Sequence, residues 1–250
     1  MISTAPSTTS ATPRSPQWRR ATRILLQFSL EQAAWAWALA LVVIAAILFT
    51  ISRFLEPQMS AVQFAYHGAL WYQFAMVITA FMSYAGAHVA NGMTRRSFIR
   101  ASLLAAGGTA MAYAAVITVL LLLEDRIYGH LGWYHGLSNI DGEVLTSGLW
   151  PYAWGALLIF FVGNLSGLLI AASYYRFGGW WGTLCLPVTL APLFLVSVFA
   201  MDHEAQWTPS DISTGVLGAA SPVLAVVVIA VGVYAYYLLV RRMAITSKAS

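Results

Sequence analysis

The amino-acid sequence predicts an all-α integral membrane protein with six transmembrane helices, and its composition and its apolar segments are the main reasons. Hydrophobic residues make up 60% of the 250 residues and charged residues only 9%, whereas a soluble domain carries about 25% charged residues. Six long apolar segments divide the chain, each close to the roughly 20 residues that a helix needs to cross a bilayer. We expect the spans at 33–52, 68–90, 101–123, 148–172, 181–200 and 215–240.

The positions of the charged residues predict how these spans are oriented. With the N-terminus placed in the cytoplasm, eleven of the 13 Lys and Arg lie on the cytoplasmic side: Arg14, Arg19, Arg20, Arg23, Arg95, Arg96, Arg100, Arg176, Arg241, Arg242 and Lys248. Eight of the nine acidic residues lie on the other side: Glu56, Glu124, Asp125, Asp141, Glu143, Asp202, Glu204 and Asp211. Because Lys and Arg near span ends are enriched on the cytoplasmic side, we expect both termini there, in a cell-membrane protein. Anionic lipid accounts for basic residues at span ends, so we expect no nucleic-acid partner.

The chain before the first span divides into two segments. Residues 1–16 are mostly Ser, Thr, Ala and Pro, so we expect a disordered cytoplasmic tail. Residues 17–31 place basic and apolar side chains at helical spacing, which predicts an amphipathic helix in the inner membrane interface; the alternative is an extension of the first span. Its interfacial residues include Trp18, Arg19, Arg20 and Arg23. Residues 32–240 then form the transmembrane domain and 241–250 a second cytoplasmic tail.

The sequence lacks several catalytic motifs, which narrows the function. It has no G-x-x-x-x-G-K-[ST] loop, and its one lysine is Lys248, so this chain has no P-loop with which to hydrolyse ATP. It has no H-E-x-x-H motif, no G-x-S-x-G elbow and a single cysteine, Cys185, which cannot form a zinc-binding pair. No Asp, Glu, Lys or Arg lies near the middle of a predicted span, where ion-coupled and proton-coupled carriers keep such groups. If the protein moves a substrate, we expect a partner to supply the energy.

One polar residue and a row of small residues stand out in the fourth predicted span. Asn164, in its middle, either makes an interhelical hydrogen bond of about 1 kcal/mol or lines a substrate path. Gly163, Gly167 and Ala171 form a row of small residues that lets another helix approach closely, in this chain or in a second copy.

The other polar candidates lie near the ends of the second span and in the outer loops. Gln73 lies near the outer end of that span, and His88 and Asn91 lie at its inner end. We expect His88 to be an interfacial histidine. The outer histidines are irregularly spaced, so no metal site is predicted from them: His67, His130, His135 and His203.

The basic loop after the second span carries the clearest local signals. Gly92 can adopt the left-handed conformation that ends a helix. Thr94 is a plausible N-cap for a short helix that exposes Arg95 and Arg96. We expect the following residues, Phe98 and Ile99, to return to the membrane surface. This loop is either a simple orientation signal or a docking element for a cytoplasmic partner.

Residues 91–98, with the sequence NGMTRRSF, resemble the Gly-x-[Ser/Thr]-Arg-[Arg/Lys]-x-x-Phe stretch between the second and third spans of ABC transporter permeases of the type-two export class. The arrangement of spans and termini resembles this family over the whole chain, whereas the sequence motif is found only in this loop. It implies that the loop is a coupling helix that docks on a separate P-loop ATPase subunit. The residues that it assigns to docking are Gly92, Thr94, Arg95, Arg96, Ser97 and Phe98. Glu31 would match an acidic residue of the N-terminal interfacial helix.

This resemblance implies a permease subunit of an ATP-driven exporter. ATP and Mg would be bound by the partner subunit, with no cofactor on this chain, and a second permease, a copy or a paralogue, would complete the exporter. Lipids, peptides and amphipathic drugs remain equal candidates for the substrate. Two alternatives stay open: a non-transporting membrane sensor, immunity or scaffold protein, and an intramembrane enzyme that uses His88 or the outer histidines.

Overall fold

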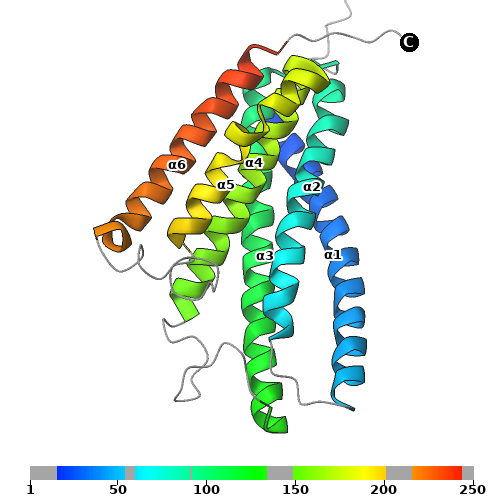
Figure 1. The fold of residues 1–250 in the computed structure, drawn as a ribbon. Helices are drawn as coiled ribbons and strands as arrows, with labels where there is room; N and C mark the ends of the chain where they lie inside the picture. Colours follow the sequence, from blue (N-terminus) through cyan, green and yellow to red (C-terminus); the bar gives the residue numbers. More distant parts are fainter. Residues whose placement is uncertain (1–15, 54–59, 91, 134–148, 201–215, 244–250) are drawn as a thin grey trace, which may run out of the picture.

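The part of the protein that the structure describes is all-helical, as the sequence predicts. The computed structural model describes residues 16–53, 60–90, 92–133, 149–200 and 216–243. These residues form six helices and no strand (Figure 1): α1 (Gln17–Ile51), α2 (Ala61–Ala90), α3 (Arg95–Leu131), α4 (Leu149–Leu184), α5 (Leu186–Ala200) and α6 (Val216–Arg241). Three predicted regions lie largely outside the described residues: the two tails, the loop residue Asn91 and most of the outer loops. Of the tails, only Pro16 and residues 241–243 are described.

Four of the helices are long and apolar enough to cross a membrane. They are α1, α3, the Tyr152–Leu184 part of α4 and the Val223–Arg241 part of α6. Helix α2 has 30 residues but is not among them, and the apolar part of α5, Leu186–Ser197, is shorter than a typical span. Helices of this kind are typical of a membrane protein, and they correspond to four of the six predicted spans.

Helix α1 differs from the prediction for the N-terminal region. Residues 17–31 do not form a separate helix; they continue into the first span, which was the alternative interpretation. The physical reason is that no Gly or Pro interrupts the segment and one buried face continues past residue 32. The residues of this face are Ala21, Leu25, Ala33 and Trp37. With 35 residues, the helix is about 50 Å long, more than the roughly 30 Å of a hydrocarbon core.

Two predicted boundaries also differ. The basic loop does not lead into a short helix, because Arg95 begins α3, which continues unbroken for 37 residues. Residues 173–180, which separate the fourth and fifth predicted spans, are helical except at Gly178, whose φ of 78° turns the chain between the two parts of α4. Glycine reaches this left-handed conformation without the strain that a Cβ would add, so a single residue suffices for the bend.

Helix α4 lies at the centre of the bundle and packs against α2, α3, α5 and α6. Small residues make this packing close. A Cβ atom on Gly163 would lie 2.8 Å from Leu70 Cδ1, and one on Gly167 would lie 3.0 Å from the carbonyl oxygen of Phe74. Gly163 and Gly167 of the predicted row of small residues therefore face α2 of the same chain.

The far end of the bundle is held by a carboxylate. Glu124, buried on α3, accepts hydrogen bonds from the backbone N–H groups of Ala61 at 2.6 Å and Val62 at 3.3 Å, and from the Ser60 hydroxyl at 2.5 Å. These groups form the N-terminus of α2, where unpaired N–H groups favour a negative charge. Glu124 thus lies inside a helix rather than in the outer loop predicted from residue 124.

Replacing Gly167 with alanine tests the close approach of α2 to α4. Because the new Cβ would meet a backbone oxygen at 3.0 Å, we expect the helices to shift apart and the free energy of unfolding to fall by about 1–3 kcal/mol. The measurement is the thermal midpoint of the purified protein in mild detergent.

Gly68→Ala is the matched control, because nothing lies within 4 Å of a Cβ at that helical position. We expect this variant to be as stable as the original protein or more stable by up to about 1 kcal/mol. Equal midpoints for the two variants would contradict the proposed packing.

Candidate functional site

One end of the bundle carries most of the positive charge. The N-termini of α1 and α3 and the C-termini of α2 and α6 meet there, at the top of Figure 1. The arginines of these segments, with that of α4, are Arg19, Arg20, Arg23, Arg95, Arg96, Arg100, Arg176, Arg241 and Arg242. The acidic residues that the structure describes lie elsewhere: Glu31 is partway along α1, and Glu124 and Asp125 are near the far end of α3. This end therefore suits a negatively charged partner or surface.

The loop between α2 and α3 is short and internally hydrogen-bonded. Gly92 has a φ of 77°, and the N–H of the next residue, Met93, donates to the carbonyl of His88 at 3.0 Å. Thr94 is the N-cap of α3: its Oγ1 accepts from the backbone N–H of Ser97 at 3.2 Å. A capped helix start directly after a left-handed glycine fixes the direction in which α3 leaves α2.

Arg95 is not a free docking residue. Its side chain is half-buried, and Nη1 donates to the carbonyl oxygen of Arg241 at 2.9 Å. Arg241 is the last residue of α6, where carbonyl groups lack partners within the helix and favour a positive charge. Arg95 therefore caps α6 and links its end to the start of α3, while Arg96 and Arg100 remain exposed.

Phe98 and Ile99 do not return to the membrane surface, so this prediction is wrong. They are 2% and 6% exposed, because α3 has already begun at Arg95 and places both on the face that packs inward. Phe98 lies 5.4 Å from the Phe81 ring and 5.9 Å from the His88 ring, measured between centroids. Phe98 anchors the loop to the bundle. Because its side chain is buried, a partner that binds at the surface cannot contact it, although the resemblance assigns Phe98 to docking.

Asn164 makes the interhelical hydrogen bond that was one of its two predicted roles. It is 1% exposed, and its Nδ2 donates to the carbonyl oxygen of Ala106 at 2.8 Å and to Thr109 Oγ1 at 3.1 Å. These bonds join α4 to α3. A second link that sequence reasoning missed joins Ser102 of α3 to Tyr236 of α6, with 2.7 Å between the hydroxyl oxygens.

The predicted residues of α1 lie along that helix, whereas His88 lies at the end of α2 beside the loop. Trp18 is half-buried and lies 5.4 Å from the guanidinium of Arg19, whereas Arg20, Arg23 and Glu31 are exposed. The imidazole of His88 stacks on the Tyr84 ring, with centroids 5.9 Å apart. Within the described ranges, no three His, Cys, Asp or Glu side chains are grouped as a metal site would require.

Comparisons with protein-family models, curated proteins and solved structures find no match to this chain. A functional assignment therefore depends on the geometry of the basic end and on the packing behind it.

Replacing Arg95 with alanine tests its role as a cap. We expect amide hydrogen exchange in the last turn of α6 to become several-fold faster, because a partly exposed charge-assisted hydrogen bond is worth about 1 kcal/mol. Hydrogen–deuterium exchange with mass spectrometry, in detergent or lipid nanodiscs, measures this.

Arg96→Ala removes an equal charge from the next position, which is exposed. It should leave exchange in α6 unchanged. Faster exchange in both variants would attribute the effect to net charge rather than to the Arg95 hydrogen bond.

Proposed function

We propose that this chain is the membrane-spanning subunit of an ATP-driven exporter, with six crossings and both termini in the cytoplasm. The observation that supports this most is the construction of the basic end. A short capped loop joins α2 to α3, Arg95 links that loop to the end of α6, and Arg96 is left exposed beside them. A partner that contacts this loop would act on three helices at once.

The energy for transport would come from the partner. A P-loop ATPase that binds ATP and Mg would contact Gly92, Thr94, Arg96 and Ser97, with acidic groups opposite the arginine. Movement of the ATPase would then displace the ends of α2, α3 and α6 as rigid elements. Such a displacement changes access to the substrate path only if the partner binds the two bundle conformations with different affinities.

A second permease, a copy or a paralogue, would complete the transporter. Asn164 and Gly163 are occupied by contacts within the chain, so the fourth-span residues support packing rather than a path through one subunit. A path between two subunits fits this arrangement and suits an amphipathic, peptide or lipid-like substrate.

A non-transporting sensor, immunity or scaffold protein is the second candidate. Two of the six residues assigned to docking favour it, because they make contacts within the chain: Arg95 bonds to the end of α6, and Phe98 is buried. A scaffold would also use an exposed basic end to hold a cytoplasmic partner, but that partner would have no ATPase activity.

Charge reversal at Arg96 distinguishes these candidates. The chain is tagged at its C-terminus, purified from its native membrane in mild detergent, and the co-purifying proteins are identified. We expect a stoichiometric P-loop ATPase, and we expect Arg96→Glu to reduce its recovery roughly tenfold, which corresponds to about 1.4 kcal/mol of binding free energy.

Arg126→Glu is the matched control, because Arg126 is also exposed on α3 but lies near the opposite end of that helix. It should leave recovery of the ATPase unchanged. Recovery of the chain alone, or with a partner that lacks a P-loop, would contradict the exporter and favour the scaffold.

A further inference from the structure

The turn between the two parts of α4 is held in one shape by its own contacts. Tyr174 and Gly182 lie on opposite sides of Gly178, and a straight helix would separate them by about 12 Å. Instead the chain folds back at Gly178, so that a Cβ atom on Gly182 would lie 3.0 Å from Tyr174 Cα. Thr183 Oγ1 donates to the carbonyl oxygen of Gly179 at 2.8 Å. Because that proton is used, the Tyr174 hydroxyl is the donor in its 2.9 Å bond to Thr183 Oγ1.

Three large aromatic side chains and one arginine belong to this turn. Trp180 and Trp181 are 77% and 64% exposed, and Phe177 is also exposed. The guanidinium of Arg176 lies over the Phe177 ring, with 4.9 Å between Cζ and the ring centroid. We call these four residues the aromatic turn. Exposed aromatic rings beside an arginine suit a surface that offers both apolar contact and negative charge.

The aromatic turn lies at the basic end of the bundle, at the depth of the lipid headgroups. Tyr175 packs there against α2, with its ring 6.4 Å from the Phe81 ring, measured between centroids. The apolar part of α4 that is long enough to cross a membrane begins at Tyr152. With Tyr152 at one membrane surface, Arg176 lies about 36 Å further along the helix. This distance exceeds the roughly 30 Å of a hydrocarbon core.

An exposed apolar stripe joins the aromatic turn to the side of the bundle. The N–H of Cys185 donates to the Trp181 carbonyl at 3.1 Å, and the Cys185 carbonyl accepts from the Thr189 N–H at 3.0 Å. Because the helix is continuous there, Trp181, Leu184 and Val188 share one face, and all three are exposed. The stripe runs from headgroup depth toward the hydrocarbon core. Lipid fits it along its whole length, whereas a cytoplasmic protein would reach only the turn.

Arg176 gives this surface a preference for negative charge. Its side chain is half-buried, and no hydrogen bond or ion pair joins it to the residues that the structure describes. Phe177 lies against the face of the guanidinium, so the N–H groups at its edge can donate to a phosphate. A zwitterionic headgroup would also bring its own cation close to the arginines of this end, which favours a headgroup with a net negative charge.

We propose that the aromatic turn binds the headgroup of an anionic phospholipid. The phosphate accepts hydrogen bonds from Arg176, and the indole rings of Trp180 and Trp181 lie against the glycerol and the first part of the acyl chains. The other arginines of the basic end attract anionic lipid to this region. Because the turn is already held in shape, little conformational entropy is lost on binding. This inference is independent of the exporter proposal.

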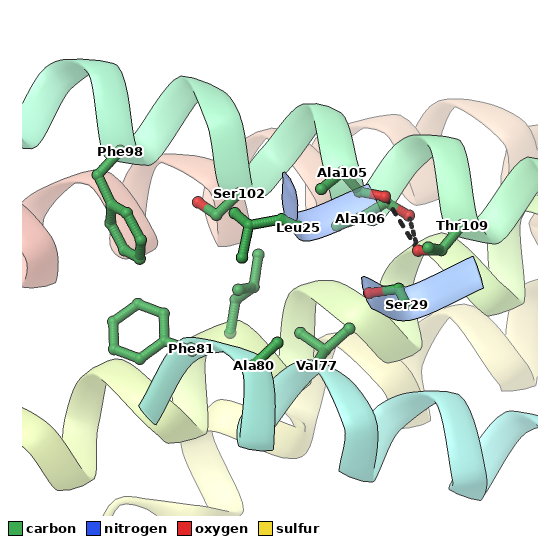
Figure 2. Close-up of a pocket in the computed structure, with 11 residues that line it drawn as sticks. Leu25, Ser29, Val77, Ala80, Phe81, Phe98, Ser102, Ala105, Ala106 and Thr109 are labelled. Carbon is green, nitrogen blue, oxygen red and sulfur yellow. Dashed lines mark hydrogen bonds between the residues drawn. The ribbon is translucent and has the colours of Figure 1, made fainter. Parts of the chain in front are cut away.

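The acyl chains of this lipid lie outside the bundle. The cavity shown in Figure 2, which Phe81 lines, has a volume of about 20 Å³. A volume of this size is sufficient for about one water molecule. An acyl chain cannot enter it, so the chains follow the exposed stripe of Trp181, Leu184 and Val188.

Fluorine NMR of the full chain in mild detergent tests the site. The protein carries 5-fluorotryptophan, and the signals of Trp180 and Trp181 are assigned by their loss in Trp180→Phe and Trp181→Phe. Phosphatidylglycerol or phosphatidylcholine with the same acyl chains is then titrated in. We expect phosphatidylglycerol to shift both signals at a mole fraction about tenfold lower than phosphatidylcholine. Inorganic phosphate should shift neither signal, because it has no acyl chain to contact the rings.

Replacing Arg176 with glutamine tests the phosphate contact. We expect phosphatidylglycerol to bind about tenfold more weakly, because charge-assisted hydrogen bonds are lost. Arg100→Gln is the matched control, since Arg100 is exposed on α3 at the same end, and it should leave the titration unchanged. Equal weakening in the two variants would overturn the site. Signals that respond to a co-purifying protein but not to phosphatidylglycerol would also overturn it.

Replacing Trp181 with leucine tests the indole contact. An indole combines an apolar ring with an N–H group for the polar side of the interface, and leucine lacks that group. Measured from the Trp180 signal, phosphatidylglycerol should bind a few-fold more weakly to this variant. Trp150→Leu is the control, because Trp150 is exposed at the opposite end of α4. Equal affinities in the two variants would overturn the proposed contact.

Discussion

The arrangement of the bundle depends on how closely α2 approaches α4. At Gly163 and Gly167 the backbone of α4 lies almost in contact with Leu70 and Phe74 of α2. In a membrane, where lipid is as apolar as the helices, close packing and interhelical hydrogen bonds are the main forces that hold helices together. The short distance at the glycines aligns α2 beside α4, and Asn164 joins α4 to α3 on an adjacent face.

Charged side chains then hold the helix ends in place. At the far end, Glu124 of α3 binds the N-terminus of α2; at the basic end, Arg95 of α3 binds the C-terminus of α6. Each charge has the sign that the helix terminus favours. Helix α3 therefore ties two neighbours, one at each of its ends. A force on the loop before α3 would act on a connected group of helices, which is the property that the exporter proposal uses.

Features that depend on neighbouring residues in the chain, such as the helices and some of their ends, could be predicted from the sequence. Apolar segments predict helices, and Gly92 and Thr94 carry the signals for ending one helix and starting the next. The long-range links could not be predicted, because Arg95 and Arg241 are 146 residues apart and Ser60 and Glu124 are 64 apart. The continuity of α1 was also missed: its basic face resembles an interfacial helix, although the buried face continues without a break. Phe98 was misplaced because its burial depends on Phe81 of another helix.

The exporter proposal requires the basic end to face the cytoplasm, and labelling from outside the cell tests this orientation. Single cysteines replace Arg242 at the basic end and Arg126 at the far end, in a chain whose Cys185 is changed to serine. Intact cells are then treated with a membrane-impermeant thiol reagent. If the basic end faces the cytoplasm, the cysteine at position 126 is labelled in intact cells, and the one at position 242 is labelled only after the membrane is opened. Labelling of position 242 in intact cells would contradict the exporter proposal, because no cytoplasmic ATPase could then reach the loop between α2 and α3.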